Sequence, residues 1–566
     1  MNVMKIKIDN KTRLMYVVFL FVLLGMIGIT SVITVQVGVV YSKKTIQSSG
    51  FSIVDNNINL SEADASFIGD AVERSAGENI DILGDMNGDG YDDILIGCYA
   101  NRSTNFYGEA HIFFGSNKDL KRNINVTNSN ITLKEQPDWD GTSMNVKGIG
   151  DVNGDGCDDI LAGIPGDDTH GSGRGQSYLF FGKKSGWPSE MNLSDASASF
   201  YGEHKNDGAG TNLAGVGDVN NDTYDDFIIG ARKNDDGGTD AGKVYLILGK
   251  ASGWTHDVSL STANASFIGE APSDYLGIKL TKGIGDVNGD GYNDILIPTR
   301  YNDEGGNLAG QVYLIFGRKT GWKKNVDIST VNASFIGEFS GDAAGQAAGI
   351  IGDINRDGYA DISIGAFNND EGGEYAGKAY IILGKASEWS MDISLSEADM
   401  AVIGDNTQMR FGYSIARLRD VNNDTYDDLI IGAPGIGGPN RGHSYLLLGK
   451  ASGWSGTHSI SNAADIIFSG EEEGDESGTD ISGGGDVNGD SKDDILIGAP
   501  KNDAGGDDAG KVYLFFDFST QILPLLLLPP EEPSTIDVWL PVIITVPIVS
   551  VAAVVAVVLI YMRKKK

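Results

Sequence analysis

The chain repeats one acidic segment seven times, and this repetition constrains its fold more than any other feature. The first copy reads GDMNGDGYDDILIG over residues 84–97. The first aspartates of successive copies are 66 to 68 residues apart, at Asp85, Asp151, Asp218, Asp286, Asp353, Asp420 and Asp486. Because self-similarity at a fixed period is the signature of repeat architectures, each copy marks one structural unit.

Each unit contains about four short apolar runs. One run precedes the acidic segment, one follows it, a third contains a tyrosine (as in residues 244–248), and a fourth leads into a Phe-x-Gly triplet (as in residues 264–269). Runs rich in β-branched and aromatic residues between Gly, Asn and Asp turns are typical of strands. Four strands in each of seven units predict an all-β fold, a seven-bladed β-propeller of four-stranded blades, with a solenoid as the alternative.

The two ends of the repeat array favour a closed ring over a solenoid. The last unit stops after its third strand, at residues 512–516, and a matching fourth strand stands at the opposite end, at residues 57–67. We expect this N-terminal strand to complete the last blade, because pairing the two fragments removes the exposed edge that each would otherwise leave.

The acidic segments have the composition of metal sites. Asp, Asn, Asp and Asp stand at positions 1, 3, 5 and 9 of every copy, and oxygen ligands without His or Cys select calcium. An EF-hand would need a glutamate at position 12, where Ile96 stands in the first copy, so the aspartate at position 9 is the closing ligand. The backbone carbonyl at position 7 is a further predicted ligand.

The predicted ligands therefore form seven sets of five residues. They are Asp85, Asn87, Asp89, Tyr91 and Asp93; Asp151, Asn153, Asp155, Cys157 and Asp159; Asp218, Asn220, Asp222, Tyr224 and Asp226; Asp286, Asn288, Asp290, Tyr292 and Asp294; Asp353, Asn355, Asp357, Tyr359 and Asp361; Asp420, Asn422, Asp424, Tyr426 and Asp428; and Asp486, Asn488, Asp490, Lys492 and Asp494. We expect up to seven Ca²⁺ ions. Turn formation by Asp, Asn and Gly is the alternative, although it does not require this spacing seven times.

Glycine is expected at position 6 of each copy but is replaced in three of them, by Thr223, Thr425 and Ser491. These three loops would be strained if the turn needs a positive φ there.

The net charge limits the classes of partner. With 78 acidic and 43 basic residues, the chain carries −35, whereas nucleic-acid binding requires a basic surface. We therefore expect no nucleic-acid partner. The loop aspartates account for 21 of the acidic residues, and seven calcium ions would reduce the charge to −21. Two cysteines, Cys98 and Cys157, are too few for a disulfide scaffold or a structural zinc site.

Both ends of the chain are apolar. Residues 14–40 contain no charged side chain and exceed the ~20 residues that span a bilayer. Residues 538–562 begin near Trp539, end near Tyr561 and precede four basic residues, the pattern of a transmembrane helix with a cytoplasmic stop. The expected organisation is a cytoplasmic basic segment (1–13), a transmembrane signal anchor or signal peptide (14–40), the propeller (53–518), a proline-rich stalk (519–537), a transmembrane helix (538–562) and a basic tail (563–566).

The repeat resembles the FG-GAP repeats of the integrin α-subunit propeller over residues 53–518. The resemblance is carried by Phe-x-Gly triplets such as Phe67-Ile68-Gly69, by the acidic loops, and by the triplets Gly432-Ala433-Pro434 and Gly498-Ala499-Pro500. It implies that the calcium loops join the first and second strands of each blade on one face, while ligand and partner meet the other face. Because integrin leg domains and a juxtamembrane motif are not found here, we do not expect an integrin-type heterodimer.

These features favour a membrane-anchored, calcium-binding recognition or adhesion protein of the cell surface, with its propeller extracellular and a protein or glycan as ligand. The alternatives are an extracellular enzyme acting on surface glycans or lipids, and a passive component of the cell envelope. We do not expect the chain to be an enzyme, because its six histidines fall in different repeats without a common pattern of partner residues. Sequons suit an exported glycoprotein and occur at Asn59, Asn101, Asn125, Asn130, Asn192, Asn221, Asn264, Asn332 and Asn423.

Recognition is expected on the face opposite the acidic loops. The turns between second and third strands are long, acidic and varied, at residues 234–238, 302–306, 369–373 and 502–506. Loops held by a rigid scaffold are where binding residues concentrate, and clustered acid favours a basic or cation-bridged partner. Asp235, Asp236, Asp303 and Glu304 are the candidate contacts.

Overall fold

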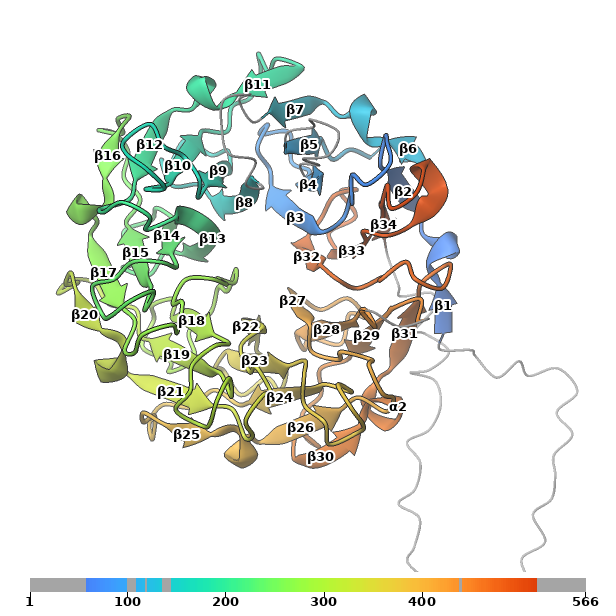
Figure 1. Cartoon of the computed structure of the whole chain (residues 1–566). Helices are drawn as coiled ribbons and strands as arrows, with labels where there is room; N and C mark the ends of the chain where they lie inside the picture. The colour runs from blue at the N-terminus through green and yellow to red at the C-terminus, as the bar shows by residue number, and fades with distance from the viewer. Residues whose placement is uncertain (1–56, 99–107, 118–119, 135–143, 437–439, 517–566) are drawn as a thin grey trace, which may run out of the picture. The chain divides into compact units, whose positions relative to one another are not determined.

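The computed structural model describes residues 57–98, 108–117, 120–134, 144–436 and 440–516. Within these residues the protein consists of seven β-sheets that are arranged in a ring (Figure 1). The all-β, seven-bladed propeller expected from the repeat is therefore confirmed. Both apolar segments, 14–40 and 538–562, lie outside the described residues, and in the part that is described no helix is long and apolar enough to cross a membrane.

Successive strands of a blade pair antiparallel, from the inside of the ring to its outside. In blade 3, β13 (Ala209–Gly217) pairs with β14 (Asp226–Ala231), β14 with β15 (Lys243–Ile247), and β15 with β17 (Ala265–Ile268). Side chains alternate between the two faces of each strand. Phe227 and Ile229 of β14 pack toward blade 2, and Ile228 packs toward blade 4. The hydrophobic core is accordingly divided into seven clusters between neighbouring blades.

The other blades follow the same order. Their strands are β3 (Asn79–Gly84), β4 (Asp93–Cys98), β5 (Glu109–Phe113) and β7 (Ile131–Lys134) in blade 1; β8 (Asn145–Gly150), β9 (Asp159–Ile164), β10 (Gln176–Phe180) and β12 (Ala198–Tyr201) in blade 2; β18 (Ile295–Thr299), β19 (Gln311–Ile315) and β21 (Ala333–Ile336) in blade 4; β22 (Ala347–Gly352), β23 (Asp361–Ala366), β24 (Lys378–Ile382) and β26 (Met400–Ile403) in blade 5; and β27 (Ser414–Leu418), β28 (Asp428–Ala433), β29 (His443–Leu447) and β31 (Ile466–Ser469) in blade 6.

Blade 7 combines segments from both ends of the described chain. It contains β32 (Ile481–Gly485), β33 (Asp494–Ala499) and β34 (Lys511–Phe515), and β34 pairs antiparallel with β2 (Ala65–Ile68). The register places Phe67 opposite Val512. The inner strands β3 and β32 also contact each other, so blades 7 and 1 are neighbours.

A fifth, short strand that sequence reasoning did not anticipate lies parallel to the outer strand of every blade. Each comes from the unit that follows in the ring, and they are β11 (Glu190–Asn192), β16 (Val258–Ser259), β20 (Val326–Asp327), β25 (Ile393–Ser394), β30 (Gly456–Ser459), β1 (Asn57–Asn59) and β6 (Ile124–Asn125). One helical turn follows each of them, at η1 (Leu60–Glu62), η2 (Val126–Asn128), η3 (Leu193–Asp195), η4 (Leu260–Thr262), η5 (Ile328–Thr330), η6 (Leu395–Glu397) and α2 (Ile460–Ala463). A further turn, η7 (Asp503–Gly505), lies in blade 7.

Blade 4 differs from the expected four strands. Its inner segment, residues 278–285, is not a β-strand, so among the described residues this blade has only three strands of its own. The segment is held by long-range contacts instead. Lys282 Nζ donates to the Ile82 carbonyl of blade 1 at 2.9 Å, and Arg417 of blade 6 donates to the Ile284 carbonyl at 2.8 Å. Lys282, Ile284 and Arg417 line a cavity of about 330 Å³ at the centre of the ring.

Candidate functional site

The seven acidic loops lie at one end of the blades. In six blades the loop joins the first strand to the second, and in blade 4 it follows the non-strand segment 278–285. In blade 1 the loop begins directly after β3, at Asp85, and its ninth residue, Asp93, is the first residue of β4. Blade 4 is the exception, because Asp294 directly precedes β18. Since neighbouring strands are antiparallel, the turns between second and third strands lie at the other end. We call these two ends the loop face and the opposite face.

Each loop is folded by its own aspartates. In loop 1, Asp85 Oδ1 accepts the N–H of Asp89 at 3.0 Å, Asp85 Oδ2 accepts the N–H of Gly90 at 2.8 Å, and Asp89 Oδ1 accepts the N–H of Tyr91 at 3.1 Å. The same three bonds recur in the other six loops. Positions 1 and 5 therefore point into the loop.

The aspartate at position 9 is the buried member of each set. Asp93 is fully buried, and its carboxylate accepts the N–H of Met86 at 3.1 Å and the N–H of Gly115 at 2.9 Å. Burial, together with the nearby Asp85 and Asp89 carboxylates, raises the pKa of Asp93 to about 8. The corresponding pKa is raised in every loop, for the same reasons, to about 7 or 8.

This arrangement fits a hard divalent cation. Three carboxylates act on one another in each loop, and a bound cation would offset both their repulsion and the desolvation of the ninth residue. Each carboxylate oxygen that accepts one N–H retains a second lone pair for a metal. The three carboxylates of one loop are not among the described clusters whose ligand atoms all lie within 4.8 Å. Metal ligation by these loops remains a prediction. The same holds for the role of the backbone carbonyls at position 7, which belong to Tyr91, Cys157, Tyr224, Tyr292, Tyr359, Tyr426 and Lys492.

The strain expected at position 6 is present in the backbone. Thr223, Thr425 and Ser491 have φ values of 80°, 82° and 67°, in the left-handed region that favours glycine. Position 4 also has a positive φ in each loop, which sequence reasoning missed, and Asn221, Arg356 and Asn423 replace glycine there.

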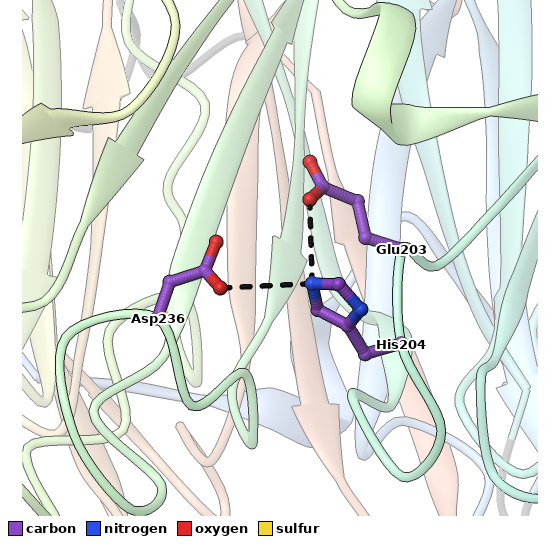
Figure 2. Close-up of side chains that lie close together, drawn as sticks. All are labelled: Glu203, His204 and Asp236. Atoms are coloured by element: carbon purple, nitrogen blue, oxygen red, sulfur yellow. Dashed lines mark ion pairs between the residues drawn. The ribbon is translucent and has the colours of Figure 1, made fainter.

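A further cluster, on the opposite face, was also missed from the sequence. Figure 2 shows His204 between Glu203 and Asp236, with Nε2 3.7 Å and 3.6 Å from their carboxylates. The ligand atoms of these three side chains all lie within 4.8 Å of one another. However, the fully buried Lys243 Nζ lies 3.1 Å from Glu203 and 2.7 Å from Asp236. One ammonium group thus already pairs with both carboxylates, so we interpret the cluster as an ion-pair bridge between blades 2 and 3.

The same bridge recurs without a histidine. Lys378 pairs with Glu338 at 3.1 Å and Glu371 at 2.8 Å, and Lys511 pairs with Glu471 at 2.9 Å. The sequence signal was a glutamate directly after Phe-x-Gly together with a lysine at the start of the third strand, about 40 residues later. Asp503, Asp507 and Asp508 form another close acidic group on this face.

The four candidate recognition residues differ in their contacts. Asp236 binds Lys243, while Asp235 and Asp303 each accept a backbone N–H within their own turns, from Asp240 at 2.8 Å and from Leu308 at 2.6 Å. The carboxylate of Glu304 makes no hydrogen bond or ion pair with any described residue. Only Glu304 of the four is therefore an exposed acid without a structural role in the described ring.

Comparison with known proteins identifies the repeat. A model of the FG-GAP repeat matches five segments, residues 148–180, 209–247, 283–315, 411–447 and 477–515. Integrin alpha pat-2 of Caenorhabditis briggsae is 29% identical over 304 residues, covering 51% of this chain and 23% of that protein. Integrin alpha-PS2 of Drosophila melanogaster is 28% identical over 261 residues, covering 44% and 17%. Phosphatidylinositol-glycan-specific phospholipase D of Bos taurus is 32% identical over 174 residues, covering 30% and 20%. The chain spans less than a quarter of the length of these relatives.

Proposed function

We propose, from the premise that this ring is an integrin α-like FG-GAP β-propeller, that the chain is a calcium-binding recognition or adhesion protein of the cell surface. The observation that carries the proposal is the set of seven complete acidic loops, each folded by the same hydrogen bonds on one face of the ring. Bound Ca²⁺ would supply positive charge to Asp85, Asp89 and Asp93 and to their equivalents. The hydrogen bonds within each loop orient these carboxylates. The packed blades connect the loop face to the opposite face, so the bound ions would also hold the turns of the opposite face in fixed positions.

Recognition is assigned to the opposite face. Among the described residues, the most exposed large apolar side chains on this face are Phe339 at 59%, Val72 at 50%, Leu308 at 40% and Tyr375 at 37%. Exposed apolar and aromatic groups with acidic residues around them suit a protein or glycan ligand that presents basic or cation-bridged groups. The side chains of Glu304 and Glu374, the latter one residue before Tyr375, make no hydrogen bond or ion pair among the described residues.

A binding assay on cells that display the full chain tests this function. We expect these cells to adhere to protein-coated or glycan-coated surfaces in calcium but not in a calcium chelator. Glu304→Lys with Glu374→Lys should abolish adhesion and leave calcium-dependent melting unchanged. Lys319→Glu, an exposed charge change in the turn between β19 and β21 on the loop face, is the matched control and should adhere normally. Equal adhesion in chelator would refute the proposed function, and unchanged adhesion of the double variant would refute the assigned face.

The membrane anchors are part of the proposal. Residues 14–40 and 538–562 would hold the propeller (53–518) outside the cell, with the stalk 519–537 between ring and membrane and residues 1–13 and 563–566 in the cytoplasm. N-terminal sequencing of the mature membrane protein tests the first anchor. We expect the chain to retain residues 14–40, whereas a start between residues 30 and 52 would identify a signal peptide.

Closure of the ring by its N-terminal strand is also proposed. The pairing of β2 with β34 and the parallel pairing of β1 with β31 support it, because residues 57–68 contribute to both blades 6 and 7. Without them, β34 and β31 would expose their edges. Deleting residues 57–67 from the full chain should cause a loss of cooperative melting or aggregation in sedimentation experiments. A melt and a sedimentation profile like those of the intact chain would contradict closure.

A second function, an extracellular hydrolase, is favoured by the similarity to the phospholipase. Two serine hydroxyls in the described residues lie within hydrogen-bond distance of a histidine: Ser469 Oγ is 3.0 Å from His443 Nδ1, and Ser129 Oγ is 3.2 Å from His111 Nδ1. Ser469 is buried and donates to Asn57 Oδ1 at 2.6 Å, and burial lowers the pKa of His443. His111 is 1% exposed, and burial lowers its pKa to about 4, so substrate and water have little access to it. The similarity covers a fifth of that protein, and we assign no enzyme activity. Release of a headgroup from phosphatidylinositol-glycan by the purified chain would reverse this assignment.

A further inference from the structure

The eighth residue of an acidic loop, which is not one of the predicted ligands, contacts the loop of the preceding blade. Asp158 of loop 2 accepts the backbone N–H of Asp85 at 2.7 Å through Oδ2. The backbone N–H of Asp158 donates in turn to the Asp85 carbonyl at 3.0 Å. One residue of blade 2 therefore binds both backbone polar groups of the first ligand of loop 1. We call this pair of bonds the clasp.

The clasp recurs at three other blade boundaries. Asp225 binds Asp151 at 3.0 and 3.2 Å, Asp427 binds Asp353 at 2.9 and 3.3 Å, and Asp92 binds Asp486 at 2.7 and 2.9 Å. The last pair joins blade 1 to blade 7. In each case the carboxylate belongs to the blade that follows in the ring, so the contacts all run in one direction.

The backbone before each clasped residue leaves room for this carboxylate. Gly84 has a φ of 90°, and a Cβ built there would lie 2.1 Å from Asp158 Oδ2. A Cβ at Gly150 would lie 2.1 Å from Asp225 Oδ2, and one at Gly352 would lie 1.9 Å from Asp427 Oδ2. Any larger residue would displace the carboxylate, so glycine at this position and the aspartate of the next blade form one structural unit.

The three remaining boundaries lack the complete clasp and provide natural controls. Ala360 faces Asp286 and donates only its backbone N–H, at 2.9 Å. Asn293 makes no hydrogen bond to Asp218 among the described residues, and Asp493 binds the N–H of Arg419 rather than that of Asp420, at 2.6 Å. The loops at these three boundaries keep the same three internal hydrogen bonds as the other loops.

Loops 1 and 4 share a second contact that makes their comparison direct. In loop 1 the Met86 carbonyl accepts the N–H of Lys183 at 2.9 Å, and in loop 4 the Val287 carbonyl accepts the N–H of Lys385 at 3.0 Å. Both donors belong to the next blade. At this boundary the two loops differ in the carboxylate of residue 8 and in the preceding segment, which is strand β3 before loop 1 and not a strand before loop 4.

The clasp acts on the residue that folds the loop. Asp85 uses both side-chain oxygens to hold the N–H groups of Asp89 and Gly90, so the orientation of its backbone sets the direction of the whole ligand set. Groups that orient metal ligands contribute to affinity without touching the metal. We propose that Asp92, Asp158, Asp225 and Asp427 are positioning residues for the metal loop of the preceding blade, so that calcium loading of each loop depends on its neighbour. This inference rests on the proposed calcium binding.

Hydrogen exchange of the full-length chain during a calcium titration tests the inference, because peptides report each loop separately. Asp158→Ala introduces the residue that blade 5 carries naturally at this position. It should raise the calcium concentration that half-protects loop 1 by roughly 10-fold or more, and leave loop 2, its own loop, unchanged. Asp92→Ala is the matched control, because it removes the same charge from loop 1 itself. It should weaken loop 7 and spare loop 1.

A gain-of-function variant keeps the test decisive if a substitution harms folding. Ala360→Asp should lower the calcium midpoint of loop 4 toward that of loop 1. A shift confined to the substituted residue's own loop, or an equal shift in all loops, would overturn the clasp, because such shifts report charge rather than position. If the loops of the unmodified chain do not respond to calcium at all, both the metal assignment and the clasp are wrong. A normal response with loop 1 unaffected by Asp158→Ala refutes the clasp alone.

Discussion

The two faces of the ring are stabilised by different interactions. On the loop face, all seven loops use the same three internal hydrogen bonds, although glycine is replaced in several of them. On the opposite face, the side chain that begins the third strand changes from blade to blade. It is Lys243, Lys378 and Lys511 in blades 3, 5 and 7, but Gln176, Gln311 and His443 in blades 2, 4 and 6, and Glu109 in blade 1.

This difference indicates that the seven loops share one structural requirement, whereas the turns of the opposite face do not. The proposed cation would explain why the loops retain one geometry even where Thr223 adopts a φ of 80°. On the opposite face each boundary is stabilised by its own side chains, so these turns are able to vary in sequence. Uniform loops suit a structural cation and varied turns suit recognition.

Removal of calcium should produce the largest effect, because it acts on all seven loops. Extracellular modules bind calcium with a Kd on the order of 10⁻⁴ to 10⁻³ M. At ten times this concentration, each independent site adds about 1.4 kcal/mol to the free energy of unfolding, or roughly 10 kcal/mol for seven sites. Calorimetric melts of the full chain in calcium and in chelator measure this difference. Superimposable melts would show that the loop face needs no cation.

Loss of a buried ion-pair bridge should rank second and should be independent of calcium. Lys243→Met leaves Glu203 and Asp236 without their ammonium partner, at a cost of about 3 kcal/mol. The measurement is the denaturant midpoint, with and without calcium. The matched control is Lys250→Met in the same blade, where the exposed lysine lies over the Trp254 ring and a loss of about 0.5–1 kcal/mol is expected. Equal losses in the two variants would contradict the bridge.

Relief of backbone strain within a loop should give the smallest effect. Thr223→Gly replaces a residue with a φ of 80° and should stabilise the chain by roughly 0.5–1 kcal/mol, since the strain relieved exceeds the chain entropy that glycine costs. The reverse change, Gly291→Thr in loop 4, should destabilise by about 1–2 kcal/mol. No atom lies within 4 Å of a Cβ built at Gly291, so that change reports backbone conformation alone. Thermal melts of both variants would sharpen or remove the strain argument.

Much of the ring could be predicted because its signals are local. The alternation in Phe227-Ile228-Ile229 and the spacing from Asp218 to Asp226 each lie within ten residues, so the strands and the position of each loop between them could be read directly. The positive φ expected at position 6 followed from the same short motif.

The features that were missed depend on partners far apart in the chain. Asp158 lies 73 residues from Asp85, and nothing in its local pattern distinguishes it from an exposed turn residue. Strand β16 has only two residues, too few for periodicity to show. The segment 278–285 resembles the inner strands of other repeats. Its different structure accompanies contacts between Lys282 and blade 1, and between Arg417 and Ile284.

The parallel fifth strands determine how neighbouring copies of this protein can meet. The outermost strand of every described blade is a short segment of two to four residues from the following unit, so the described part of the ring offers little strand edge for another chain to extend. Copies crowded together at high local density would therefore remain separate folded bodies instead of merging their sheets. Any lateral assembly would have to be built from side chains, which makes it reversible and open to regulation by salt and by surface charge.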